Sequence, residues 1–255
     1  MNLLIQYITY RIKAKGRHGT HSPFIYSFIN NCLTTKIDKK FLSQRKKLFK
    51  TLKKDPTIIK IKDFGAGSKS LGDSRKISKI FSTSSSKGKF SLLLYRLSKH
   101  YTLKNTLELG TSLGIGTIHL SQGNPEGKVT TIEACPNTYS YAQNNFNQLS
   151  TTNILSILST FDDFLNTYSG EKFDLVFIDG HHEGNALINY LEKLKVHTHN
   201  DTIFILDDIR WSKSMLESWD KIILNPSYNV TIDLFRMGII IPRNQQKKEH
   251  FLIKF

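Results

Sequence analysis

The sequence predicts an α/β protein. We expect a doubly wound, mostly parallel seven-stranded sheet with an antiparallel C-terminal hairpin, preceded by a basic, mainly helical N-terminal region. Three observations support this prediction. Short apolar segments alternate with amphipathic segments from residue 105 onward. Two apolar runs near the end of the chain are separated by only two residues. The residues before 105 instead carry apolar side chains at helical spacing.

Five segments after residue 105 are almost continuously apolar, as expected for parallel strands that helices cover on both faces. The segments between them are compatible with helices, most clearly residues 183–196, where Leu187, Leu191 and Leu194 share one face. In such a sheet, ligands bind beyond the carboxyl ends of the strands. The five predicted strands are residues 106–109, 128–132, 154–158, 173–178 and 202–206.

The end of the chain breaks this alternation. Residues 229–235 and 238–242 are apolar runs separated by Arg236 and Met237, which predicts an antiparallel hairpin. Residues 250–255 are a candidate for an extra strand.

The front of the chain is predicted to be helical and basic. Ser22 and Pro23 have the residue types of a helix N-cap and first helical position. Residues 41–52 carry an apolar stripe opposite a lysine-rich face. Residues 1–104 hold 24 Lys and Arg against 4 acids, a net charge of +20, whereas residues 105–255 hold 12 against 17, a net charge of −5. We therefore expect a lid or substrate region over residues 1–104 and a Rossmann-like domain over residues 105–255.

The composition narrows the class of protein. The chain has 255 residues, of which 39% are hydrophobic and 22% charged, which is typical of globular proteins. Cys32 and Cys135 are too few for a disulfide framework, which favours a reducing, cytoplasmic location. Apolar runs long enough for a membrane span are lacking in the sequence.

A nucleoside-binding site is predicted at the ends of the first two strands after residue 105. Gly110 follows the first strand, where glycine lets a ligand approach the backbone. Glu133 ends the second strand, where a carboxylate can accept hydrogen bonds from both ribose hydroxyls. The glycines at 110, 114 and 116 lack the spacing of a pyrophosphate-binding turn, which favours a cofactor without phosphates.

These residues resemble those of a known family. The run from Glu108 to Gly114, together with Glu133, resembles the class I S-adenosylmethionine-dependent methyltransferases, over about residues 105–242. The resemblance implies that the glycine turn holds the methionine part of the cofactor, that Glu133 holds the ribose and that residues 160–162 flank the adenine. The cofactor-binding candidates are Glu108, Gly110, Thr111, Ser112, Gly114, Glu133, Thr160, Phe161 and Asp162.

Three aspartates are predicted to lie at the same edge of the sheet. Asp179 ends the fourth predicted strand, and Asp207 and Asp208 end the fifth. Carboxylate oxygens suit Mg²⁺ or another hard divalent cation, although the adjacent pair can share an ion only if the chain turns there. The trio resembles that of the metal-dependent O-methyltransferases. Alternatively, some of these aspartates cap the following helix or pair with Arg210.

The resemblance also suggests a catalytic group. Catechol-type relatives have a lysine three residues after the strand-four aspartate, and this chain has His182 in that position. We expect His182 to act as general base, with His181 as a substitute, on an acceptor hydroxyl bound to the cation beside Asp179. The alternative is that both histidines are polar loop residues.

The predicted function is methylation of a small hydroxylated acceptor by S-adenosylmethionine, assisted by a divalent cation. The alternatives are an RNA or tRNA methyltransferase that uses the basic region, and a cofactor-binding scaffold without turnover. The basic face could also be merely solvated or attach to a membrane surface. Neither the acceptor nor the oligomeric state is specified by the sequence.

Three further motifs of the sequence allow other interpretations. The run from Gly110 to Gly114 also fits the nucleophile elbow of α/β-hydrolases, with Ser112 as nucleophile and an aspartate and His250 as partners. The glycine-rich run at residues 63–67 is interpreted as a structural loop near the mouth of the site. His21 is a candidate substrate contact.

Overall fold

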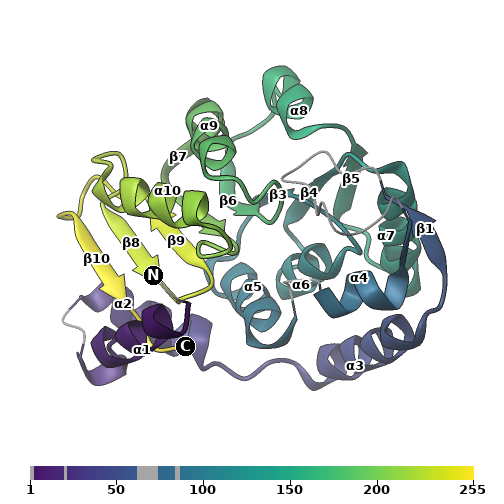
Figure 1. The fold of residues 1–255 in the computed structure, drawn as a ribbon, viewed down its shortest axis with the longest axis horizontal. Coiled ribbons are helices and arrows are strands. Elements are labelled where there is room, and N and C mark those ends of the chain that lie inside the picture. The colour runs from purple at the N-terminus through teal and green to yellow at the C-terminus, as the bar shows by residue number, and fades with distance from the viewer. Residues whose placement is uncertain (1–2, 20–21, 62–73, 84–86) are drawn as a thin grey trace.

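The structure, a computed structural model, describes residues 3–19, 22–61, 74–83 and 87–255. An eight-stranded mixed sheet runs through the molecule in the order β10-β8-β9-β7-β6-β3-β4-β5 (Figure 1). The sheet therefore has one strand more than predicted. Its strands are β3 (Asn105–Leu109), β4 (Lys128–Glu133), β5 (Ile154–Leu158), β6 (Phe173–Ile178), β7 (Thr198–Leu206), β8 (Val230–Asp233), β9 (Gly238–Ile241) and β10 (Glu249–Leu252).

The five strands from β3 to β7 are parallel, and β9 runs antiparallel to both β7 and β8. The additional strand, β10, pairs in parallel with β8 at the edge of the sheet. The N-terminal segment also holds this edge, because Lys15 N donates to Leu252 O at 2.8 Å and Lys254 N donates to Lys15 O at 3.0 Å. The two ends of the chain are therefore joined by backbone hydrogen bonds.

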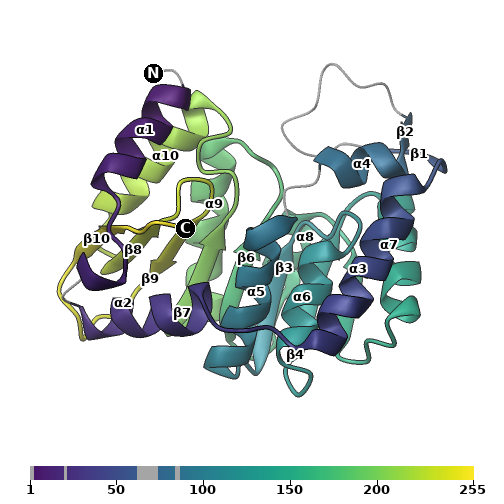
Figure 2. The same cartoon turned by 90° about the horizontal axis from the view of Figure 1, so that it is seen from below.

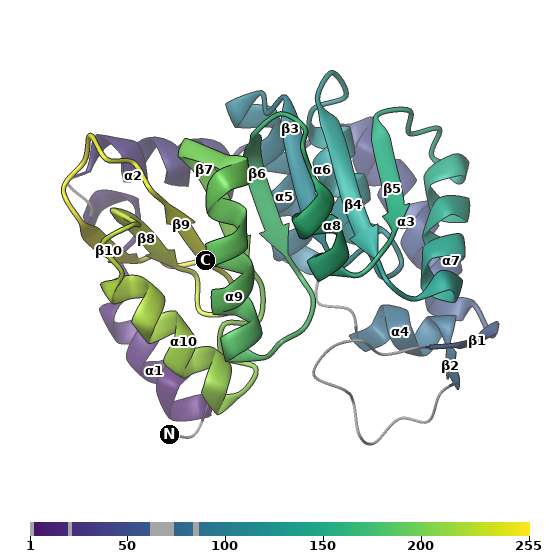
Figure 3. The ribbon, with the colours of Figure 1, turned by 90° about the horizontal axis from the view of Figure 1, so that it is seen from above.

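Helices cover both faces of the sheet because successive strand residues point to opposite sides. Leu175 and Phe177 of β6 face one hydrophobic cluster, whereas Val176 and Ile178 face another. Figure 2 shows the first face, with α2 (Pro23–Phe28), α5 (Gly88–Tyr101) and α6 (Ile115–Gly123). Figure 3 shows the second face, with α8 (Phe161–Thr167), α9 (Gly184–Leu194) and α10 (Lys213–Leu224). The remaining helix of this part is α7 (Pro136–Gln148), beyond β5.

The front of the chain packs directly on the sheet. Ser22 caps α2, with Pro23 at its first position, as the sequence indicates. Phe28 of α2 and Leu94 of α5 belong to the same buried cluster as Phe177 of β6. Residues on both sides of position 104 thus share one core. The other front elements are α1 (Leu3–Lys13), a short 3-10 turn (Arg17–Gly19), a π-helical turn (Ile29–Leu33), α3 (Lys39–Lys54), α4 (Ile77–Thr83), and the antiparallel pair β1 (Ile58–Lys60) and β2 (Ser74–Lys76).

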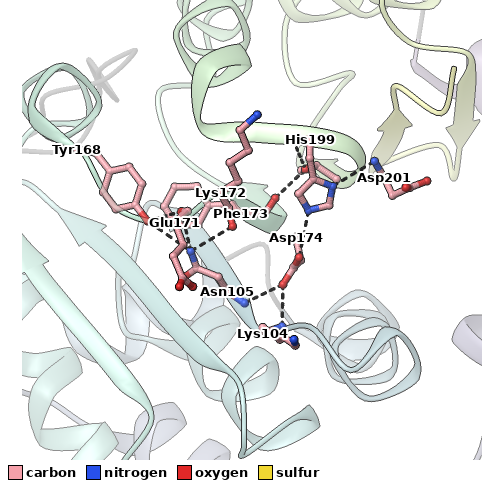
Figure 4. Close-up of polar contacts among 10 residues, drawn as sticks. Lys104, Asn105, Tyr168, Glu171, Lys172, Phe173, Asp174, His199 and Asp201 are labelled. Atoms are coloured by element: carbon pink, nitrogen blue, oxygen red, sulfur yellow. Dashed lines mark hydrogen bonds and ion pairs between the residues drawn. The ribbon is translucent and has the colours of Figure 1, made fainter.

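A polar network ties the beginnings of β3, β6 and β7 together, at the opposite edge of the sheet from their carboxyl ends (Figure 4). Asp174 accepts hydrogen bonds from the backbone N–H groups of Lys104 and Asn105, at 2.7 and 2.9 Å, and contacts His199 Nε2 at 3.1 Å. Tyr168 donates to Glu171 O at 2.7 Å. This network aligns the strands that carry the candidate site at their other ends.

Within the described residues, no helix is both long and apolar enough to span a bilayer.

Candidate functional site

The turn after β3 brings three strand ends close together. Gly110 has a φ of +109°, and a Cβ at this position would lie 2.4 Å from Asp179 O, so a larger residue would separate the ends of β3 and β6. Ser112 follows with a φ of 49°. Its backbone N–H donates to Glu133 Oε2 at 2.8 Å. The turn thereby connects β3 with the end of β4.

Glu133 is held by backbone donors on both carboxylate oxygens. Its other oxygen accepts from Cys135 N at 2.9 Å. Burial raises the pKa of Glu133, and the hydrogen bonds from Cys135 and Ser112 oppose this shift. These two bonds fix the direction in which the carboxylate points, which is into a cavity.

The cavity has a volume of about 450 Å³ and lies at the carboxyl ends of β3, β4 and β6. We call it the cofactor cavity. The small β1–β2 sheet and α4 lie at the same edge (Figure 3). The predicted residues that line the cavity are Gly110, Ser112, Glu133, Thr160, Phe161, Asp162, Asp179 and His182.

Residues 160–162 begin α8 and form one wall of the cavity. Thr160 is the N-cap of this helix and accepts from Asp163 N at 3.1 Å. The Phe161 ring packs edge-to-face on Tyr190, with centroids 5.6 Å apart. A Cβ at Gly180 would lie 2.8 Å from the Phe161 ring, so the ring packs closely on this backbone. Asp162 is paired with Lys193. The wall is an aromatic face flanked by hydrogen-bonding groups.

Glu108, in contrast, does not line the cofactor cavity. Its side chain is buried beneath the turn, where it accepts hydrogen bonds from Thr117 and, at 2.7 Å, from Thr131. A Cβ at Gly116 would lie 2.3 Å from Glu108 Oε1, which shows how closely α6 covers this carboxyl. Burial raises the pKa of Glu108 to about 7.

Thr111 and Gly114 also lie outside the wall of the cavity, contrary to the prediction. The Thr111 hydroxyl is buried and lies 2.6 Å from Thr131 Oγ1. Gly114 precedes α6 with a φ of +77°, and a Cβ there would lie 2.3 Å from the Phe146 ring. Both residues shape the turn without facing a ligand.

The histidine pair follows the end of β6. His181 and His182 both line the cofactor cavity beside Asp179. The Nδ1 atom of His181 lies 2.9 Å from the Tyr190 hydroxyl. The His182 ring lies beside Trp211, with centroids 6.1 Å apart. His182 thus stands at the side of the cavity that faces Trp211.

Asp207 and Asp208 are held by an arginine. The chain turns at Asp208, which has a φ of 51°, so both carboxylates reach one group. That group is Arg236, whose Nη2 lies 3.2 Å from Asp207 Oδ2 and whose Nε lies 3.0 Å from Asp208 Oδ1. Arg210, the partner considered from the sequence, instead pairs with Asp233.

The predicted metal site therefore does not fit these residues. Asp179 lines the cofactor cavity, Asp207 is fully buried against Arg236, and Asp208 lines a different cavity. Among the described residues, no group of three or more His, Cys, Asp or Glu side chains is placed to hold a metal ion. A divalent cation would have to displace the guanidinium of Arg236, which already pairs with Asp207 and Asp208.

The hydrolase alternative also fails on geometry. His250 lies on β10 and its Nδ1 is 2.8 Å from the Thr231 hydroxyl. Strands β8, β9, β7 and β6 lie between β10 and β3, after which Ser112 follows. These residues cannot form a triad.

Arg75 was not predicted, although it lines the cofactor cavity. It lies on β2, and its buried Nε has no hydrogen-bond partner within the described structure. The sequence around it has no spacing that connects it with the strand ends, so no pattern identifies it.

The lysines of α3 do not line this cavity. Residues 63–67 and His21 lie outside the described residues.

Comparison with known proteins agrees with this geometry. Residues 107–209 match a family model described as a methyltransferase domain. This part of the chain is therefore similar to a methyltransferase domain. The chain is also similar to a catechol O-methyltransferase from Mycobacterium tuberculosis, with 31% identity over 134 residues. The match spans 52% of this chain and 59% of the mycobacterial protein, which is less than two thirds of its length.

Solved structures support the fold of the methyltransferase domain. An O-methyltransferase from Bacillus cereus, in complex with S-adenosylhomocysteine (SAH), has a TM-score of 0.52 and 20% identity, and the match covers 61% of this chain and 81% of that protein. An SAH-bound methyltransferase from Podospora anserina has a TM-score of 0.55 and 12% identity, and covers 85% of this chain and 99% of that protein. The chain therefore has the Rossmann-like methyltransferase fold.

Proposed function

We propose that this protein transfers the methyl group of S-adenosylmethionine to a hydroxyl oxygen of a small molecule. The observation that carries the proposal is the position of Glu133. Its carboxylate is fixed by two backbone N–H groups and lines the cofactor cavity beside the Gly110 turn. A carboxylate at this place can accept hydrogen bonds from two neighbouring ribose hydroxyls.

The lining of the cavity fits the other parts of this cofactor. Phe161 supplies an aromatic face for the adenine. The turn at Gly110 and Ser112 leaves room for the methionine part. The Arg75 guanidinium, whose Nε has no hydrogen-bond partner among the described residues, fits the carboxylate of that part. When bound, S-adenosylmethionine supplies a methyl group on a positively charged sulfur.

His182 is the proposed general base. Imidazole changes its charge near neutral pH, so it can accept the hydroxyl proton as the acceptor oxygen gains the methyl group. His181 is less suited, because its Nδ1 already lies at hydrogen-bond distance from Tyr190. Asp179 lies at the same wall and contributes negative charge to the cavity, which would favour a positively charged sulfur there.

A divalent cation is left out of this proposal because the Arg236 guanidinium already pairs with both Asp207 and Asp208. An RNA acceptor is also left out, because the lysines of α3 do not line the cofactor cavity. The name of the mycobacterial relative, a catechol O-methyltransferase, supports a hydroxyl oxygen on a small molecule as acceptor.

Labelled S-adenosylmethionine, incubated with the protein and fractionated cell extract, tests this proposal. We expect label in a small-molecule fraction, unchanged by a chelator or by ribonuclease. His182→Asn should lower turnover by about 10²-fold or more while SAH affinity stays unchanged. His100→Asn, at an exposed position at the end of α5, is the matched control. Label found only in RNA, or full turnover by His182→Asn, would contradict the proposal.

A further inference from the structure

One face of α1 holds this helix on the protein. Tyr10 and Ala14 are buried, and the Tyr10 hydroxyl donates to Ile253 O. Tyr7 packs edge-to-face on Phe235, with ring centroids 4.9 Å apart. These positions are three and four residues apart, so they share one side of the helix. The helix lies at the end of the molecule that carries β10 (Figure 2).

The opposite face of α1 is apolar and exposed. Ile5, Ile8 and Ile12 are three and four residues apart, and 52%, 50% and 77% of their surfaces are exposed. Leu4, beside them, is 63% exposed. A surface helix usually carries polar residues on its outer face. Single exposed apolar side chains are common, whereas a contiguous row of them indicates a binding surface. We call this row the apolar face of α1.

Exposed cations border the apolar face. By helical spacing, Arg11 lies on one side of it and Lys13 on the other, and Lys15 follows. Residues 1–37 of the sequence contain neither Asp nor Glu. Burial lowers the pKa of Lys89, and the positive charge of Arg11 lowers it further, so α5 adds a cation to this surface. The surroundings of the apolar face are therefore positively charged.

We propose that α1 binds the surface of a membrane that contains anionic lipids. With the helix lying parallel to that surface, the apolar face enters the boundary between headgroups and acyl chains. The bordering cations contact the lipid phosphates, since long Lys and Arg side chains can reach the headgroups while the helix backbone lies deeper. This attachment goes beyond the proposed methyl transfer and does not depend on it.

Helix α3 has more lysines but lacks the apolar half of such a site. Its apolar residues Phe41, Leu48 and Leu52 are buried in the core. It can therefore contribute charge to a distant anionic surface but cannot insert a row of side chains. Exposed apolar area and positive charge coincide at α1.

A second copy of the chain fits the apolar face less well. A symmetric contact places the same residues of both copies opposite each other. Arg11 and Lys13 would then approach the same cations of the other copy, and residues 1–37 offer no acid to compensate them. Anionic lipid headgroups complement both the apolar row and its charges.

Co-sedimentation of the full chain with sucrose-loaded vesicles tests the inference. One vesicle preparation is phosphatidylcholine alone, and the other contains about one quarter phosphatidylglycerol. We expect wild type to bind the anionic vesicles about tenfold or more tightly than the neutral ones, and to bind them less tightly as salt concentration rises.

Two triple variants separate the apolar and the charged contributions. Ile5→Gln/Ile8→Gln/Ile12→Gln should weaken binding to anionic vesicles about tenfold or more, with an unchanged circular dichroism spectrum. Its control replaces exposed apolar residues of other elements, Leu155→Gln/Val196→Gln/Leu224→Gln, and should bind as wild type does. Arg11→Gln/Lys13→Gln/Lys15→Gln should lose the preference for anionic vesicles, whereas Lys46→Gln/Lys47→Gln/Lys50→Gln, at exposed positions of α3, should keep it.

Three results would overturn the inference. They are no binding of wild type to anionic vesicles, unchanged binding by the isoleucine variant, and equal losses in the two charge variants. Sedimentation velocity without vesicles adds a fourth, because a wild-type dimer that the isoleucine variant fails to form would assign the apolar face to a second copy. SAH affinity should be the same in all variants, and absence of SAH binding by wild type would contradict only the proposed function.

Discussion

At the scale of single residues, two glutamates on neighbouring strands have different roles. Both follow apolar strand residues, yet Glu108 lies inside the protein beneath α6 and Glu133 faces the cofactor cavity. The difference arises because Glu108 lies within β3, where α6 covers its side chain, whereas Glu133 is the last residue of β4. A carboxylate at a strand end can reach a ligand, whereas one inside a covered strand must be satisfied by protein donors.

The buried carboxyl predicts a pH dependence of stability. The pKa of Glu108 is raised from 4.5 to about 7 in the folded protein, so between these values the folded chain binds a proton that the unfolded chain has lost. The contribution of Glu108 to stability is therefore complete below about pH 4.5 and decreases as pH rises towards about 7. As the pH rises over this interval, the free energy of unfolding of Glu108→Gln should increase by about 3 kcal/mol relative to that of wild type.

Chemical denaturation of both proteins at about pH 5 and about pH 8 measures this difference. Glu126→Gln, at an exposed position, serves as control and should follow wild type. A stability difference between Glu108→Gln and wild type that does not change with pH would contradict the assignment of a raised pKa.

Arg75, whose Nε has no hydrogen-bond partner in the part of the chain that the structure describes, predicts a selective effect on ligand binding. If Arg75 contacts the carboxylate of the methionine part, Arg75→Met should weaken SAH binding by about tenfold, or about 1.4 kcal/mol. The affinity for 5′-methylthioadenosine, which lacks that carboxylate, should stay the same. Calorimetric titration with both ligands measures this, with Lys76→Gln as the exposed neighbouring control. Equal losses for both ligands would assign Arg75 a purely structural role.

At the scale of elements, the turn between β8 and β9 supplies the charge that neutralises the end of β7. Arg236 lies in this turn and contacts Asp207 and Asp208. Asp207 has no exposed side-chain surface, so its charge depends on the guanidinium. The antiparallel arrangement of β9 between β7 and β8 brings this turn next to the end of β7.

Removing this guanidinium should therefore destabilise the protein. We expect Arg236→Met to lower the free energy of unfolding by about 3–5 kcal/mol, because it leaves a buried carboxylate unpaired. Wild type should show no thermal shift with Mg²⁺ beyond that of NaCl at equal ionic strength, and chelation should leave turnover unchanged. Arg243→Met, which removes an ion pair whose carboxylate partner, Asp201, is 59% exposed, is the control. A specific Mg²⁺ shift in wild type would restore the metal hypothesis.

At the scale of the whole molecule, the two ends of the chain are hydrogen-bonded to each other beside the C-terminal strands. Lys15 bonds to the backbone on both sides of Ile253, and the Tyr10 hydroxyl donates to Ile253 O. The same helix, α1, carries Tyr7 to the second cavity, which Asp208 also lines. The helical front thus contributes to the core, to the edge of the sheet and to both cavities.

The sequence predicted the parts of this arrangement that depend on local pattern. The apolar runs predicted the parallel strands, and the β3 turn with Glu133 predicted the cofactor cavity. Strand β10 was only a candidate, because its residues are partly exposed and lack a continuous apolar run. The pairing of Arg236 with Asp207, and the position of Arg75, depend on contacts between segments distant in the chain. Their residue types and spacing carry no signal of those contacts.

The central claim is that Glu133 holds an adenosyl cofactor at the ends of β3 and β4. Calorimetric titration of the purified full chain with SAH, for wild type and Glu133→Ala, measures this directly. We expect one site per chain in wild type and an affinity at least about tenfold weaker in the variant, with an unchanged fold by circular dichroism. Absence of binding to wild type, or equal affinity in both proteins, would contradict the account.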